Sequence, residues 1–286
     1  MTEVITRDAQ SLADQILDTV REDKVALPPF PELFMRVQRI LSEDDTDAEK
    51  VARAVSVDPG LVASLLRVAN SAAFGGLQQI TDLKQVIARL GLTQVGSITA
   101  ALQVKGQFAD DHSGRPDTLQ TLWDHSVTSA FAAQRLAEKV EADAGQAFLA
   151  GLLHDCGNLL VLKAVDHLRH SGQLEIDPTE PMLREMMDRL HCELGHFALT
   201  TWNFPEPLPS IVLHHEDAAE GGTDPLLLCV QAADLITRKL GFALSPDPEL
   251  LLLQEPAIEN LALDDIMLAT LMVDLEDHLE QLRSVF

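Results

Sequence analysis

Signals for the start and end of α-helices recur along the whole sequence, whereas the apolar–polar alternation of a half-buried strand is nearly absent. Thr46 is expected to open a capping box, and Asp58 precedes a proline, as at a helix N-terminus. Gly91 is expected to end the helix LKQVIARL, and Gly75 and Gly76 the helix before it. Aromatic residues make up only 4% of the chain and tyrosine is absent, which suits helices better than strands. We therefore predict an all-α protein of roughly a dozen helices.

Two polar stretches predict where this helical chain divides. Residues 109–118 interrupt the helical pattern with glycine and proline, and residues 215–225 form a second, weaker break. Near the end of the sequence, the segment from Asp264 to Arg283 has the periodicity of an amphipathic helix. Its predicted apolar stripe consists of Ile266, Leu268, Leu271, Leu275 and Leu279.

The formal net charge of −24, from 21 basic and 45 acidic residues, limits the partners that the chain can bind. A surface this acidic repels DNA, RNA and anionic membranes, and it favours basic protein partners. The segment VARAVSVDPGLVASLLRVAN has helix-turn-helix spacing, but Arg53 and Arg67 do not form a basic face. We therefore expect protein partners, and neither nucleic acid nor a membrane.

Histidines and aspartates recur within apolar, helix-type stretches of the second half of the chain. The candidate metal ligands are His125, His154, Asp155, His191, His214, His215 and Asp234. Polar side chains among buried apolar residues cost free energy unless they pair or bind a ligand, so we predict that these residues converge on one pocket. His215 is the least certain member, because Glu216 and Asp217 suggest that it faces water.

Imidazoles and carboxylates suit iron, manganese, zinc or nickel, and a carboxylate such as that of Asp155 can bridge two ions. We therefore predict a divalent transition-metal site with one ion or two. Two alternatives stay open. The cluster could be a remnant that binds no metal and serves as a hydrogen-bonded seam between helices, and Asp234 could simply pair with Arg238 four residues later.

Several sequence features favour the cytoplasm. The N-terminal residues contain neither the basic nor the apolar region of a signal peptide. No uncharged apolar run approaches the ~20 residues that span a bilayer. The three cysteines, Cys156, Cys192 and Cys229, are widely spaced and include no CxxC pair, as is typical of a reducing compartment. Cys156 and Cys192 each follow a candidate ligand and are interpreted as small buried apolar residues.

Taken in order, the strings LPPFPEL, DPGLVASLLRVANSAAFGG, ITDLKQVIARLGL, LWDHS, AFLAGLLHDCGN, HCELGHFALTTWNFP and LHHED resemble the HDOD family, a branch of the HD superfamily. The resemblance implies a bacterial, all-helical signalling or regulatory module without known catalysis. It also implies a two-lobed helical bundle with an HD-type second lobe. The expected division is an N-terminal helix (1–26), an HDOD domain (27–222, with lobes 27–108 and 117–222) and a C-terminal helical extension (223–286) that completes the second lobe.

The second lobe also resembles the HD-GYP phosphodiesterases, which hydrolyse cyclic-di-GMP at a centre of two or three metals. The resemblance implies the same ligand set: His125 in the leading position, His154 and Asp155 as the namesake pair, His191 in HxxxG, the double histidine 214–215, and Asp234. Two departures stand out. Asn158 occupies the position of a lysine in those enzymes, and HEDAAEGG replaces the GYP signature.

These departures favour a regulatory module that acts through signalling protein partners and a nucleotide-type second messenger, with no catalytic residue assigned. The alternative is a metal-dependent phosphohydrolase or cyclic-dinucleotide phosphodiesterase, in which Asp155 would be catalytic.

Overall fold

The computed structural model describes residues 2–22, 30–43, 45–71, 74, 78–109, 114–174, 177–217 and 224–283, and this part of the chain contains helices and no strand. In chain order the elements are α1 (Thr2–Arg21), α2 (Glu32–Leu41), α3 (Ala48–Val55), α4 (Pro59–Ala69), α5 (Leu83–Ala109), α6 (Pro116–Lys139), α7 (Ala144–Leu153), α8 (Gly157–His170), α9 (Glu180–Thr201), α10 (Leu208–His214), α11 (Pro225–Lys239), η1 (Leu252–Gln254), α12 (Pro256–Asn260) and α13 (Asp265–Arg283). The predicted all-α class is confirmed.

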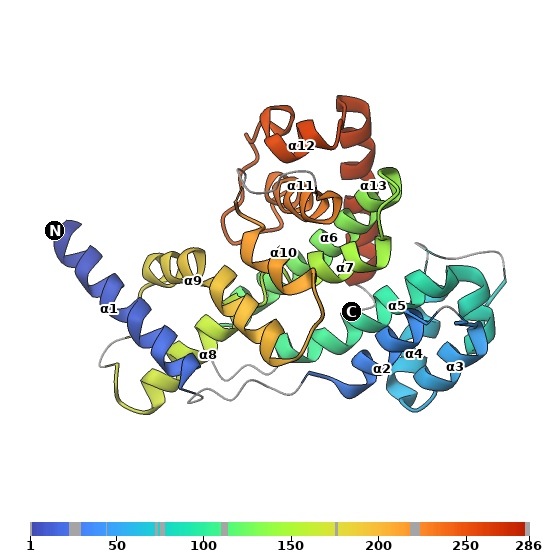
Figure 1. Cartoon of the computed structure of the whole chain (residues 1–286), viewed down its shortest axis with the longest axis horizontal. Coiled ribbons are helices and arrows are strands. Elements are labelled where there is room, and N and C mark those ends of the chain that lie inside the picture. The colour runs from blue at the N-terminus through green and yellow to red at the C-terminus, as the bar shows by residue number, and fades with distance from the viewer. Residues whose placement is uncertain are drawn as a thin grey trace.

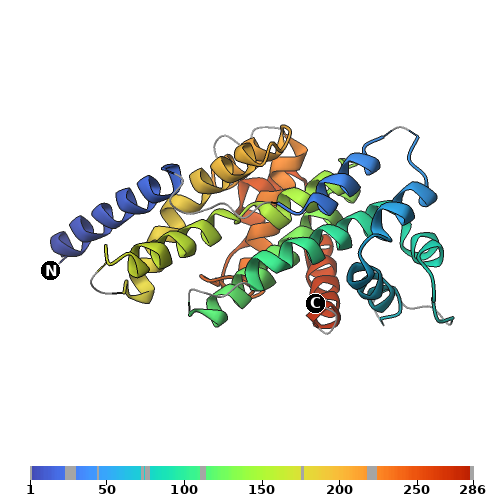
Figure 2. The ribbon, with the colours of Figure 1, turned by 90° about the horizontal axis from the view of Figure 1, so that it is seen from below.

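The helices form two lobes, each with its own apolar core (Figure 1). Helices α2 to α5 build the first lobe around a core that includes Val51, Leu65 and Ile98. The second lobe contains α6 to α13, with α6 packed on α7 and α11, and α9 packed on α8 and α10. Helix α1 lies against α8 and α9, at the end of the molecule opposite α3 and α4 (Figure 2). The two-lobed bundle predicted from the resemblance is therefore confirmed.

Local signals place most helix ends where the sequence predicts them. The carboxylate of Asp58 accepts hydrogen bonds from the backbone N–H groups of Gly60 and Leu61, as an N-cap should. At Gly91 the backbone takes φ 79°, which interrupts the helix within α5 before it resumes toward the second lobe. The pair at 75–76 lies outside the described residues.

The predicted capping box at Thr46 is wrong by one residue. Asp47 is the N-cap of α3, and its carboxylate accepts the backbone N–H of Lys50 at 2.7 Å. The hydroxyl of Thr46 donates instead to the carbonyl of Ile40. A charged carboxylate interacts more favourably with the positive end of the helix dipole than a hydroxyl does, which accounts for the shift.

The C-terminal helix forms as predicted, but its apolar stripe is narrower. Leu268, Leu271 and Leu275 are buried, whereas Ile266 is 77% exposed. At about 100° per residue, Ile266 lies roughly 200° around the helix from Leu268, so it faces solvent. The side chain of Leu279 lies outside the described part of the chain.

One apolar segment, from Ala144 to His170, has the length and hydropathy of a membrane-spanning helix, although charged residues such as Asp155 and Lys163 interrupt it. In the fold it comprises α7, a turn and α8. Of its most apolar window, 78% is buried inside the protein. This segment is the core of the second lobe.

Candidate metal centre

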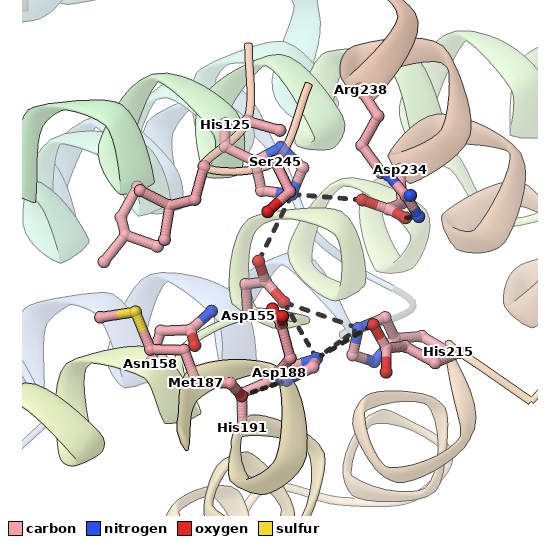
Figure 3. A pocket seen from close by; sticks show the side chains of 14 residues that line it. His125, Asp155, Asn158, Met187, Asp188, His191, His215, Asp234, Arg238 and Ser245 are labelled. Atoms are coloured by element: carbon pink, nitrogen blue, oxygen red, sulfur yellow. Dashed lines mark hydrogen bonds and ion pairs between the residues drawn. The ribbon is translucent and has the colours of Figure 1, made fainter. Parts of the chain in front are cut away.

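Five elements of the second lobe bring five of the predicted ligands to the lining of one cavity of about 190 Å³ (Figure 3), and a sixth, His154, lies behind them with its Nε2 3.7 Å from Asp155 Oδ1. The six residues are His125 on α6, His154 and Asp155 in the turn between α7 and α8, His191 on α9, His215 just after α10, and Asp234 on α11. The structure brings these six residues, far apart in the sequence, close to one another.

Glycines allow the helices to approach closely enough for this convergence. A Cβ atom at Gly151 would lie 2.7 Å from the Ser129 carbonyl oxygen, so α7 packs directly on the backbone of α6 and carries His154 toward His125. A Cβ atom at Gly157 would overlap the carbonyl oxygen of His191, so the start of α8 rests on the backbone of α9. The two contacts set the spacing of the ligands on either side of Asp155.

All four imidazoles are oriented in the same way. The Nδ1–H of each ring donates to a backbone carbonyl oxygen, at 2.7 Å from His125 to Phe242, and at 2.8 Å from His154 to Gly151, from His191 to Met187 and from His215 to Val212. A carbonyl oxygen can only accept, so Nδ1 carries the proton and Nε2 is the atom directed at the cavity. Protein histidines that bind metals through Nε2 are held in this way.

The ligand atoms fall into two groups. In the first, His125 Nε2 lies 3.1 Å from His154 Nε2, 3.3 Å from Asp234 Oδ1 and 3.4 Å from Asp155 Oδ2. In the second, His191 Nε2 lies 3.3 Å from His215 Nε2, and the two nitrogens are 3.4 and 3.6 Å from Asp155 Oδ1. Asp155 therefore presents Oδ2 to His125 and Oδ1 to His191 and His215, and His154 Nε2 lies 3.7 Å from Oδ1.

This donor set fits a pair of divalent transition-metal ions. Ligand nitrogens and oxygens about 2.1 Å from a tetrahedral ion are separated by roughly 3.3–3.4 Å from one another, close to the distances within each group. His125, His154 and Asp234 would hold one ion and His191 and His215 the other, with Asp155 between them. Such an arrangement of imidazoles and a shared carboxylate is typical of dinuclear sites.

The double histidine divides between the inside and the outside of the site, and the less certain of the two predicted ligands, His215, is the one that lies inside. His215 is buried in the cluster, whereas the side chain of His214 is 33% exposed and pairs with Asp217 through Nδ1 at 3.1 Å. Consecutive helical residues point about 100° apart, and the rotation of α10 turns His215 into the cluster and His214 away from it. Ile211 and Val212 of α10 are buried, and their spacing of four and three residues from His215 could have identified the inward member.

The electrostatic surroundings shift the pKa values of the histidines in opposite directions, so that their protonation states differ at neutral pH. Burial, together with the nearby His215 and His125, lowers the pKa of His154 to about 4. Burial also opposes a charge on His191, but Asp155 and Cys192 outweigh it and raise the His191 pKa to about 9. The pKa of Asp155 stays well below its usual value despite burial, because the surrounding imidazoles favour its ionised form. A cation beside Asp155 is therefore strongly favoured.

Sequence reasoning missed several residues that line the cavity. Asp188 lies one helical turn before His191, a spacing that could have revealed it. Arg238, considered only as a partner of Asp234, lines the cavity and pairs with that carboxylate at 3.8 Å. Asn158 is 4% exposed, and its Oδ1 has no hydrogen-bond partner among the described residues. The wall is thus rich in carboxylates and carries a guanidinium on one side.

The HDOD domain family model matches residues 27–218. The chain belongs to the HDOD family. An uncharacterized protein of Treponema pallidum (strain Nichols) is 25% identical over 245 residues, which cover 82% of this chain and 45% of the relative. The chain therefore spans less than half the length of that relative.

Solved structures share the fold of this HDOD chain. An HDOD domain protein of unknown function from Geobacter sulfurreducens has a TM-score of 0.75 at 19% identity, with 97% of this chain and 99% of the other covered. A protein of Shewanella amazonensis SB2B, provisionally named a metal-dependent phosphohydrolase, has a TM-score of 0.70 at 22% identity, with 94% and 99% covered. A provisionally named signal transduction protein of Marinobacter aquaeolei VT8 has a TM-score of 0.70 at 18% identity, with 97% and 65% covered. At these identities the similarity shows the fold alone.

Proposed function

We propose that this HDOD chain is a signalling module whose second lobe binds two divalent transition-metal ions, and that metal and ligand occupancy control its binding of protein partners. The observation that supports the proposal most directly is the orientation of four imidazoles, each with Nδ1 fixed on a carbonyl and Nε2 directed at the shared carboxylate of Asp155. A merely structural seam has no need to direct four nitrogens at one another.

The ligand is proposed to be a phosphate-bearing molecule of the nucleotide type. The wall includes the carboxylates of Asp155, Asp188, Glu216 and Asp234 against the guanidinium of Arg238. Two divalent ions would offset those carboxylates and leave Arg238 to attract an anion. The cavity is smaller than the roughly 300–1,000 Å³ of pockets that enclose a drug-sized ligand. It suits a phosphate group, with the remainder of the ligand outside it.

We expect metal binding to stabilise the wild-type protein and to require the inward-facing ligands. At about 100 times the dissociation constant, a bound ion contributes about 2.7 kcal/mol, which raises the melting temperature by roughly 5 °C or more. Wild-type protein purified without chelator should contain iron, manganese, zinc or nickel by elemental analysis. Asp155→Ala and His215→Ala should contain much less of the metal.

His214→Ala provides a matched control, because it removes the neighbouring imidazole that points out of the cluster. Its metal content and metal-dependent thermal shift should equal those of the wild type. If neither wild-type nor control protein retains metal, and added Fe²⁺, Mn²⁺ or Zn²⁺ leaves the melting temperature unchanged, the metal centre does not exist.

A second candidate function is a metal-dependent phosphohydrolase, which the position of Arg238 on the cavity wall favours. Divalent ions supply Lewis-acid chemistry to a phosphoryl group when bound. The guanidinium of Arg238 can bind phosphoryl oxygens in a bidentate manner and would supply a positive charge that Asn158 does not. Asp155 would orient both halves of the site.

This candidate predicts turnover of phosphomonoesters or phosphodiesters, including cyclic dinucleotides, with Mn²⁺ or Fe²⁺. Arg238→Lys should raise KM more than it lowers kcat, because it keeps the charge but loses the forked geometry. Asp155→Ala should abolish turnover, and His214→Ala should preserve it. If metal-loaded wild type turns over none of these substrates, the regulatory role stands alone.

A further inference from the structure

Cys192 lies directly beside the second group of ligand atoms. Its Sγ is 3.3 Å from His191 Nε2 and 3.8 Å from His215 Nδ1. His191, Cys192 and His215 each offer a ligand atom within 4.8 Å of the others. Cys192 is only partly buried, so the expectation that it is a small buried apolar residue does not account for it.

The other two cysteines differ in their surroundings. Cys156 is buried in the apolar core of the second lobe, where its Sγ packs at Gly195. Cys229 is fully buried on α11. In the described part of the chain, Cys192 is the cysteine whose Sγ makes hydrogen-bond contacts with imidazole nitrogens. The chain thus provides two matched controls for one cysteine.

We propose that Cys192 is a sulfur ligand of the metal subsite formed by His191, His215 and Asp155, and that this subsite selects zinc or another thiophilic divalent ion. The inference rests on the proposed metal centre and specifies which ion one half of it takes. When the ion binds, the S–H bond of Cys192 breaks, its proton passes to solvent and a metal–sulfur bond forms; no group is oxidised or reduced.

The distances support sulfur coordination. In a tetrahedral zinc site with Zn–N near 2.1 Å and Zn–S near 2.3 Å, adjacent nitrogen and sulfur ligands lie roughly 3.5 Å apart. The 3.3 Å between Cys192 Sγ and His191 Nε2 is close to that value, as are the separations of the two nitrogens from Asp155 Oδ1. Because Cys192 Sγ approaches His215 from the Nδ1 side, at 3.8 Å, its side chain would have to turn toward Nε2 for all four donors to bind one ion.

The two subsites would then differ in metal preference. The first subsite offers only nitrogen and oxygen ligands, from His125, His154, Asp234 and Asp155. Nitrogen and oxygen ligands accept manganese and iron as well as zinc, whereas a thiolate favours the softer ions. Four protein ligands, including Cys192, would also leave the second subsite closed, as in structural zinc sites.

Cobalt(II) provides the test, because a cobalt–thiolate bond gives a near-ultraviolet charge-transfer band that nitrogen and oxygen ligands do not. Full-length protein, reduced and freed of metal by a chelator, is titrated with Co²⁺ and followed by absorbance and by equilibrium dialysis. Wild type, Cys156→Ser and Cys229→Ser should show the band. Cys192→Ser should still bind cobalt at the first subsite but lack the band.

Metal selectivity gives a second readout that misfolding would not mimic. Cys192→Ser should lower the affinity for Zn²⁺ by more than the roughly 10–100-fold that loss of an outer-shell partner causes. Its affinity for Mn²⁺ at the first subsite should stay within a few-fold of wild type. Equal losses for both ions would indicate general damage and contradict the proposal.

The results of these experiments distinguish a failure of the Cys192 proposal from a failure of the proposed metal centre. Cobalt bound without a charge-transfer band, or with a band that survives Cys192→Ser, overturns the role of Cys192 and leaves the metal centre intact. Dialysis that detects no bound cobalt, zinc or manganese overturns both.

Discussion

Replacing Gly157 with alanine is expected to lower the free energy of unfolding by at least about 3 kcal/mol, because overpacking against a backbone cannot be relieved by a rotamer change. The added methyl group would overlap the carbonyl oxygen of His191 and lie 2.7 Å from the backbone nitrogen of Gly195. Helices α8 and α9 would have to separate, and Asp155 would move away from His191. We therefore expect a melting temperature lower by roughly 6 °C or more and the loss of metal-dependent stabilisation.

Two other glycines calibrate this result. Gly106 lies on α5 with nothing within 4 Å of its added Cβ, so Gly106→Ala should be neutral or stabilise the protein by up to about 1 kcal/mol. At Gly195 the added methyl group meets the side chain of Val212 at 2.7 Å, so Gly195→Ala should have an intermediate effect. Urea denaturation of the three variants gives the order of their free energies of unfolding. A Gly157→Ala protein as stable as wild type would show that the close approach of α8 and α9 is not required.

The fold followed from local signals because helix formation depends on residues close in sequence. Asp58 and Gly91 act within one turn of their own positions, and the structure places their helix boundaries as predicted. The turn at His154 and Asp155 was harder to foresee, since GLLHDCGNLLVL has no proline and its polar residues were explained as candidate ligands. Its cause lies elsewhere in the chain, in the contact of Gly157 with α9.

The residues that form the centre of the candidate site could be predicted from the sequence, whereas the other residues that line its cavity could not. Buried polar side chains in apolar helices are visible in the sequence, which is why His125 and Asp234 were found although they lie 109 positions apart. Which of His214 and His215 points inward depends on the rotation of α10, a tertiary property. Asp188 and Arg238 lie one helical turn from His191 and Asp234, a spacing that places them near the site, but their facing the cavity depends on the tertiary placement of α9 and α11.

Chelator-treated protein is expected to be most stable near pH 6.5 and to lose several kcal/mol of stability on either side. His191 has a folded-state pKa of about 9 against an ordinary value of 6.5. Its contribution is complete below pH 6.5, where both states are protonated, and is lost as the pH rises through 9. At about 1.4 kcal/mol per pKa unit, that loss is about 3 kcal/mol. His215, whose pKa is also raised, acts in the same direction.

Below pH 6.5 the change of stability with pH has the opposite sign. His154 has a folded-state pKa of about 4, so between pH 6.5 and 4 the unfolded chain binds a proton that the folded chain does not. Stability therefore falls as the pH drops through this window, again by about 3 kcal/mol. The pKa values of Asp155 and Asp234 lie below the ordinary 3.8, and their protonation in the unfolded chain adds a further loss below about pH 4.

Urea unfolding at pH 4.5, 6.5 and 9, with and without Zn²⁺, tests the expected loss of stability above pH 6.5 (the alkaline limb) and below it (the acid limb). In metal-free protein, His191→Gln should make the alkaline limb shallower without altering the acid limb. Bound metal should abolish the alkaline loss, because the ion replaces the protons beside Asp155 and metal affinity rises as those protons leave. A metal-free profile that stays flat from pH 6.5 to 9 would mean that Asp155 does not hold protons on the histidines around it. The electrostatic demand for a cation at this centre would then be absent.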